Sequence, residues 1–211
     1  MLKDLTVAQF GEVLGSSSPA PGGGSVAALS GMLGANLLSM VCRLTIGKKG
    51  YEAQEGEASS VLGESDRLGQ SLLRHIDLDT EAFNEVMAAF KLPKASEDEK
   101  AARTAAIQQG YKSAIQSPLA IARDCLEVLQ LAERLLGRSN TNALSDLGVA
   151  GQQAFAGLEG ALMNVRINLP SIKDADFVTQ TIGEIDSLAS DGRERAERIY
   201  GSVMKDLAST A

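Results

Sequence analysis

The sequence contains no tryptophan, and aromatic residues make up only 4% of its 211 residues. A core with so few large rings has to be filled by Ala, Leu, Val, Met and Gly, which suits closely packed helices and disfavours an all-β fold. One histidine and two cysteines are too few for a disulfide framework or a Cys/His zinc site. We therefore expect no metal site, and the absence of a secretion signal at the start favours a cytoplasmic protein.

Positive charge is scarce as well. The 20 Lys and Arg residues are outnumbered by 27 Asp and Glu residues, and the formal net charge is -7 at pH 7. A chain with this balance offers no basic surface to a phosphate backbone, so nucleic acid is not an expected partner. The length of 211 residues fits one domain, residues 1–211.

Proline is rare, and its five positions divide the chain into long stretches without a strong helix breaker. These stretches predict an all-α fold, a single-domain bundle of long helices. The expected elements are a short helix capped by Thr6, a helix opened by Ser25 and reaching about Gly47, a helix within residues 52–92, a helix started by the Ser96 and Glu99 capping box and interrupted or kinked at Pro118, a helix from Asp146 to about Asn168 capped by Ser145, and a surface helix from Asp174 to the end.

Charged residues are missing from the second expected helix, since none occurs between Gly15 and Cys42. Its apolar residues recur at helical spacing, and Ala27 and Gly31 belong to a stripe of small residues that lets another helix approach closely. A membrane span is the competing interpretation, but the glycine and polar content of this segment suits a protein interior better. We expect a deeply buried central helix, at or near a subunit interface, and no membrane partner.

The segment from Gly22 to Ala27 matches the dinucleotide pattern G-x-G-x-x-A. Its context fails, because no strand precedes it and no acidic residue follows about 20 positions later. Glycines that enter a helix also leave backbone N–H groups unpaired at the positive end of the helix dipole, where an anion or a carbonyl oxygen can bind. A tight entry turn without a ligand is the alternative.

Asp79 interrupts an apolar stripe in the helix expected within residues 52–92. The stripe, which is expected to be buried, includes Ile76, Phe83 and Phe90. Ile76 and Phe83 are seven positions apart, and position 79 fills the gap on the same face. Burial of a carboxylate raises its pKa toward the range useful for proton transfer near neutral pH. A buried Asp that only ties helices together is the structural alternative.

The polar residues next to Asp79 in the sequence are expected on other faces of the helix. Asp77, for example, lies about 200° from Asp79 around the helix axis. We expect Asp77 and Glu81 on a solvated face and His75 to be partly exposed rather than catalytic.

Asn164 and Asn168 lie one turn apart on a face of small residues. Their amides can form structural hydrogen bonds between helices, or they can recognise the donors and acceptors of a heterocycle. Both interpretations are open at this point.

Five ordered blocks together resemble the C-terminal domain of formiminotransferase-cyclodeaminase and its stand-alone bacterial cyclodeaminase/cyclohydrolase relatives. The resemblance covers nearly the whole chain and implies an all-helical subunit that forms a homodimer. The blocks are residues 19–31, 44–52, 77–83, 145–150 and 164–169.

The resemblance also implies the ligand and the residue that carries the proton. The ligand is a tetrahydrofolate one-carbon derivative, possibly polyglutamylated, with no cofactor beyond this substrate, and Asp79 is the implied proton carrier. Within one subunit Lys48 is too far along the helix to share the glycine site, so we expect it to reach the partner's site in an antiparallel dimer. The expected substrate-binding residues are Pro21, Gly22, Gly23, Gly24, Ser25, Lys48 and Asn164.

Two reactions fit such a site. Cyclodeamination closes N10 of 5-formimidoyltetrahydrofolate onto the amidine carbon and releases ammonia, whereas cyclohydrolysis adds water to 5,10-methenyltetrahydrofolate and gives 10-formyltetrahydrofolate. Ring closure is intramolecular and needs no positioned water, so the sequence with its single buried acid favours the cyclodeaminase. The alternatives are the cyclohydrolase and a non-catalytic helical oligomerisation scaffold.

Overall fold

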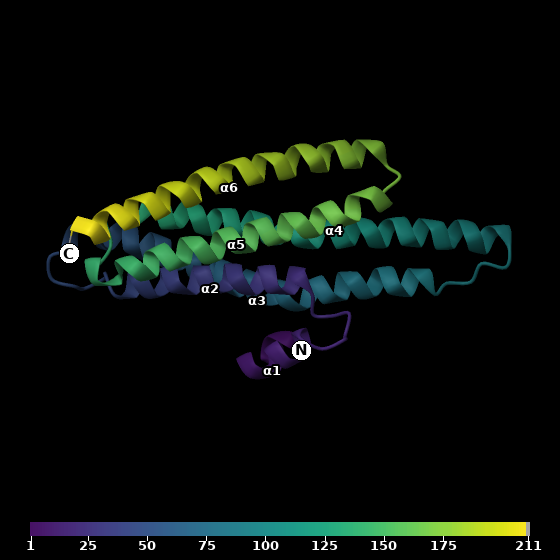
Figure 1. Ribbon diagram of the computed structural model, residues 1–211, viewed down its shortest axis with the longest axis horizontal. Coiled ribbons are helices and arrows are strands. Elements are labelled where there is room, and N and C mark those ends of the chain that lie inside the picture. The colour runs from purple at the N-terminus through teal and green to yellow at the C-terminus, as the bar shows by residue number, and fades with distance from the viewer. Residues whose placement is uncertain (210–211) are drawn as a thin grey trace.

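A computed structural model describes residues 1–209, and within this range the chain forms six α-helices and no strand. Short 3-10 turns join several of them, and the expected all-α fold is confirmed. The longer helices run along the long axis of the molecule, with α1 lying beside the bundle (Figure 1). The helices are α1 (Val7–Leu14), α2 (Gly23–Arg43), α3 (Glu55–Phe90), α4 (Glu97–Arg134), α5 (Leu144–Asn168) and α6 (Ala175–Ser209).

Helix α2 is the centre of the bundle and packs against α3 and α5, while α4 packs against the same two helices and α6 lies over α5 and α4. Small residues make this close packing possible. A Cβ on Gly31 would lie 2.5 Å from the Cys125 Sγ of α4, and a Cβ on Gly157 of α5 would lie 2.8 Å from the Ala27 carbonyl oxygen. The small-residue stripe of α2 therefore packs inside the subunit.

The expected deep burial of α2 holds for one side of the helix, where Leu38 and Val41 are fully buried together with the small residues. Leu33 and Met40 of α2 and Leu44 at its C-cap differ from the expectation, because they face outward and remain 44%, 36% and 47% exposed. By length and composition α2 could cross a membrane, but 56% of its most apolar window is buried against the rest of the protein.

Two helix starts agree with the sequence, and two differ. Thr6 caps α1 and Ser96 caps α4 as expected, Ser96 in the expected capping box with Glu99 and Thr6 in a capping box with Gln9. Helix α2 begins at Gly23 with Gly22 as N-cap, two residues before the expected start at Ser25. Helix α5 begins at Leu144 because a 3-10 turn runs directly into it, which places Ser145 inside the first turn instead of at the cap.

Pro118 does not interrupt its helix, since α4 continues from Glu97 to Arg134. A proline inside a helix has no N–H to donate, so the carbonyl four residues earlier, that of Ala114, loses its helical partner. In this structure the Asn168 side chain of α5 supplies the missing donor, with Nδ2 3.3 Å from the Ala114 oxygen. A neighbouring helix thus compensates for the proline.

Candidate active site

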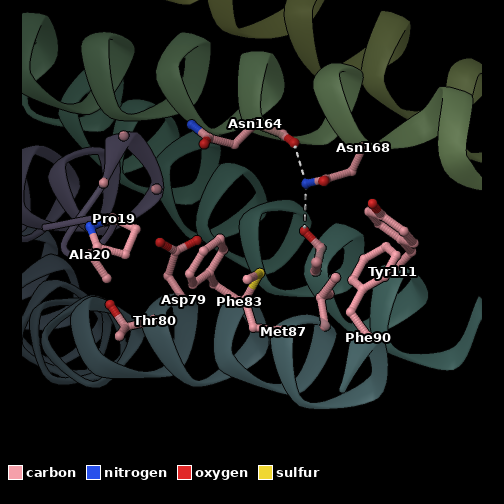
Figure 2. A pocket seen from close by; sticks show the side chains of 15 residues that line it. Pro19, Ala20, Asp79, Thr80, Phe83, Met87, Phe90, Tyr111, Asn164 and Asn168 are labelled. Carbon is pink, nitrogen blue, oxygen red and sulfur yellow. Dashed lines mark hydrogen bonds between the residues drawn. The ribbon is translucent and has the colours of Figure 1, made fainter. Parts of the chain in front are cut away.

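A cavity of about 320 Å³ lies among the N-terminus of α2, the second half of α3, the middle of α4 and the end of α5. Figure 2 shows Asp79 and Asn164 at this cavity from different helices. Five residues proposed from the sequence line it, namely Gly22, Gly23, Gly24, Asp79 and Asn164. The fold therefore brings together segments that are more than 80 positions apart in the chain.

The Asp79 carboxylate is held at the start of α2. The buried Ser25 hydroxyl donates to the Ile76 carbonyl at 2.9 Å and to Asp79 Oδ2 at 3.3 Å, and it lies 3.4 Å from Thr80 Oγ1. Ser25 is not among the residues that line the cavity within the described chain. From its place behind the carboxylate, the Ser25 hydroxyl can orient Asp79.

The glycines explain how the helix start comes so close. A Cβ on Gly24 would overlap the Asp79 carboxylate, and a Cβ on Gly23 would lie 3.1 Å from Asn164 Nδ2. At Gly22 a Cβ would meet nothing within 4 Å. The segment therefore fits both interpretations, the tight entry turn and the anion site. The tight turn brings the N-terminus of α2 against an anion of the protein itself, the Asp79 carboxylate.

The position of Asp79 changes its acidity. Burial raises the pKa of the Asp79 carboxyl, and hydrogen bonds from the Ser25 side chain and backbone oppose this rise without cancelling it. A carboxyl with a raised pKa retains its proton to higher pH and can both accept and return a proton during a reaction.

Asp77 is not solvated, contrary to the expectation. Its side chain accepts a hydrogen bond from the Leu2 backbone N–H at 2.7 Å, and Lys3 Nζ lies 4.0 Å from Oδ2. The N-terminal 3-10 turn covers this side of α3, which the sequence did not indicate, and leaves Asp77 only 8% exposed. Glu81 is exposed as expected. Asp77 thus binds the N-terminal turn, whereas Asp79 binds Ser25 at the start of α2.

The asparagines show both roles that the sequence left open. Asn164 Nδ2 donates to the Gly160 carbonyl at 2.8 Å, and Asn168 Nδ2 donates to the carbonyls of Asn164 and Ala114 at 3.0 and 3.3 Å. Both side chains also line the cavity (Figure 2). Their nitrogens face the protein, and no hydrogen bond within residues 1–209 occupies either amide oxygen.

The other end of the cavity is apolar, and the sequence reasoning missed it. Phe83 and Phe90 were expected in a buried stripe but are 36% and 42% exposed and line the cavity together with Met87. Tyr111 of α4 meets Phe90 edge to face, with ring centroids 6.3 Å apart. The spacing of these α3 residues after Asp79 was a signal in the sequence, but helical periodicity alone does not distinguish a core face from a pocket wall.

Three residues considered from the sequence lie elsewhere. Pro21 is buried and does not line the cavity within the described chain, although its neighbours Ala20 and Gly22 do. Lys48 lies beyond the other end of α2, where its ammonium donates to Asn140 Oδ1 at 2.7 Å. His75 is half-buried as expected, with Nε2 3.8 Å from Asp124 Oδ2.

A solved structure shares this helical fold. The chain matches the crystal structure of formiminotetrahydrofolate cyclodeaminase from Thermotoga maritima with a TM-score of 0.83 and 28% sequence identity. The match covers 100% of this chain and 99% of that one. This chain therefore belongs to the same class of all-helical domains as that structure.

Sequence comparisons give the family. A model described as formiminotransferase-cyclodeaminase matches residues 6–187, and the chain therefore belongs to this family, as its sequence blocks indicated. A methenyltetrahydrofolate cyclohydrolase from Methylorubrum extorquens is 45% identical over 203 residues, which are 96% of this chain and 98% of that protein. The formimidoyltransferase-cyclodeaminase of Rattus norvegicus is 34% identical over 202 residues, but the chain spans only 37% of its length.

Gly24→Ala is expected to return the pKa of Asp79 toward its ordinary value of about 3.9. The added Cβ pushes the carboxylate out of its buried position, and solvent then stabilises the charged form. Gly22→Ala is the matched control, since its Cβ meets open space and its φ of -124° suits alanine. NMR titration of the Asp79 carboxyl carbon measures both variants. Equal titration curves in the two variants would contradict the role assigned to Gly24.

Asp79→Asn is expected to become more stable relative to the unaltered protein as pH rises. The pKa of Asp79 is raised on folding, so between the unfolded and folded pKa values only the folded chain holds the proton. The free energy of unfolding of the unaltered protein therefore falls as pH rises from about 4 through the folded pKa, and the Asn variant lacks this loss. Urea unfolding at a series of pH values measures the difference between the two proteins. A difference independent of pH would show that Asp79 is not perturbed.

Proposed function

We propose that this protein is a methenyltetrahydrofolate cyclohydrolase, an enzyme of one-carbon tetrahydrofolate chemistry. The observation that carries the proposal is the 45% identity to the Methylorubrum extorquens cyclohydrolase over 98% of that protein's length. The cavity supports it, since Asp79 is a partly buried acid with a raised pKa beside a pocket for a small molecule. This reverses the order favoured by the sequence, which placed cyclodeamination first.

The proposed chemistry needs one proton carrier. Water attacks the methenyl carbon between N5 and N10 of the substrate, and the Asp79 carboxylate accepts a proton from that water. The bond between the carbon and N5 then breaks, Asp79 returns the proton to N5, and loss of the remaining hydroxyl proton leaves the formyl group on N10. The Ser25 hydroxyl keeps the carboxylate in place throughout.

Cyclodeamination is the second candidate, and two observations favour it. The Thermotoga maritima structure that shares the fold bears this name, and the rat relative is a formimidoyltransferase-cyclodeaminase. In this reaction N10 attacks the amidine carbon, and the same carboxyl delivers a proton to the departing ammonia. The two reactions pass through a tetrahedral carbon between the same two nitrogens, so one cavity suits both.

Parallel assays with the two substrates test the function. We expect kcat/KM for hydrolysis of 5,10-methenyltetrahydrofolate, followed by loss of its absorbance, to exceed kcat/KM for ammonia release from 5-formimidoyltetrahydrofolate. Asp79→Asn should lower turnover by on the order of 10² to 10⁴, because an amide cannot carry the proton. Asp77→Asn is the control, since the Asn oxygen can still accept from the Leu2 N–H.

The other outcomes point to specific alternatives. Dominant ammonia release would restore the cyclodeaminase, and a folded protein with no turnover of either substrate would support a scaffold. A larger loss in Asp77→Asn than in Asp79→Asn would move the proton carrier to Asp77.

We also propose that the protein is a homodimer that joins the exposed apolar faces of α2 and α5. On α2 these residues include Leu33 and Met40, and on α5 they include Met163 and Ile167, which are 64% and 76% exposed. Burial of such a face against a second copy removes it from water. Lys48 can approach the cavity only from the partner subunit, because α2 is about 32 Å long.

Leu33→Glu is expected to convert the dimer into a folded monomer, because a charge at the centre of an apolar interface is costly to bury. The side chain is 44% exposed in one subunit, so folding should tolerate the change. Ile182→Glu on α6 is the control, with a similarly exposed side chain outside the proposed face. Sedimentation equilibrium measures the molecular mass of both variants. A dimeric Leu33→Glu protein would place the interface elsewhere.

A further inference from the structure

The proline inside α4 fixes the orientation of the Asn168 side-chain amide. Because Pro118 has no N–H, the Ala114 carbonyl is left without a helical donor, and Asn168 Nδ2 bonds to it at 3.3 Å. The same Nδ2 also donates to the Asn164 carbonyl at 3.0 Å. Two carbonyl neighbours require the nitrogen on that side, since an oxygen there would be repelled by both. The remaining polar atom, Asn168 Oδ1, is therefore an acceptor with a fixed orientation.

This acceptor lies at the end of the cavity away from Asp79, together with Phe90 and Tyr111 (Figure 2). The cavity wall on α3 runs from Asp79 to Phe90, about 16 Å along the helix axis. Asn164 of α5 lies at the Asp79 end, since a Cβ on Gly23 would be 3.1 Å from its Nδ2, and this Nδ2 donates to the Gly160 carbonyl. The cavity is thus an elongated slot with an acid at one end and a neutral acceptor beside aromatic rings at the other.

The charge of the cavity wall decides which part of a folate enters this far end. Asp79 is the one charged side chain among the cavity-lining residues within 1–209. The glutamate tail of a folate carries carboxylates. The far end of the cavity cannot stabilise them, because its wall has no cationic side chain and an amide oxygen repels a carboxylate. The pyrimidine ring of a reduced pterin is flat and neutral, and its edge carries the 2-amino group as a donor. This amino group lies at the opposite end of the bicycle from N5 and the substituent that bears N10.

We propose that the slot takes the reduced pterin with its pyrimidine edge at Asn168, and that Asn168 Oδ1 accepts a hydrogen bond from the 2-amino group. This arrangement points N5 and the bridging carbon toward Asp79 and leaves the glutamate tail outside the slot. The edges of Phe90 and Tyr111 border the ring. Asn168 is then a specificity residue for the pterin, and the inference rests on the proposed use of a tetrahydrofolate.

The test compares two ligands in two proteins by anaerobic calorimetric titration. The probes are tetrahydrofolate and its 2-desamino analogue, in which a hydrogen replaces the amino group. In the unaltered protein we expect the analogue to bind about tenfold more weakly, the effect of one hydrogen bond. In Asn168→Ala the two ligands should bind equally. Gln152→Ala, an exposed amide earlier on α5, should retain the full preference.

A second variant separates recognition from folding. Asn168→Ala removes the side-chain donor to the Ala114 carbonyl. In the double variant Pro118→Ala/Asn168→Ala, the alanine at position 118 has a backbone N–H that can donate to this carbonyl. The double variant should fold with wild-type stability and still bind both ligands equally. If either variant keeps the tenfold preference, Asn168 does not contact the amino group and the inference is overturned. Failure of the unaltered protein to bind tetrahydrofolate at all would instead overturn the proposed function.

Discussion

The site depends on one close approach, that of the α2 N-terminus to the carboxylate of α3. Only glycine fits at position 24, because a Cβ there would occupy the space of the Asp79 carboxylate. The approach removes Asp79 from water, which raises its pKa, and it places Ser25 where its hydroxyl reaches the carboxylate. Without this contact Asp79 would be an ordinary solvated carboxylate on a helix surface.

Glycines also let the other helices that form the cavity pack closely against one another. Gly31 and Gly157 let α2 pack directly on α4 and α5, and this packing brings Asn164 against Gly23. Pro118 adds a polar constraint, since the Ala114 carbonyl, which loses its helical donor, accepts a hydrogen bond from Asn168 on α5. Four helices therefore contribute to one small cavity, and a change in any of their contacts is transmitted to its shape.

The relatives place this helical unit in two settings. The match covers 98% of the Methylorubrum extorquens cyclohydrolase but only 37% of the rat formimidoyltransferase-cyclodeaminase. Both proposed reactions need a held carbon between two nitrogens and one proton carrier, and the hydrolysis also needs a water molecule at that carbon.

The sequence by itself determined the helical fold, the family and the identity of the unusual acid. Helical periodicity, the capping boxes at Thr6 and Ser96 and the break in the apolar stripe at Asp79 are local patterns, which depend on neighbours a few positions away. Only the tertiary structure decided that Asp77 is buried by the N-terminal turn and that Phe83 and Phe90 line a cavity. It likewise decided that the Asn168 amide nitrogen donates to the carbonyls of Ala114 and Asn164. These features depend on which helices meet and at what distance, and this is set by contacts between residues far apart in the chain.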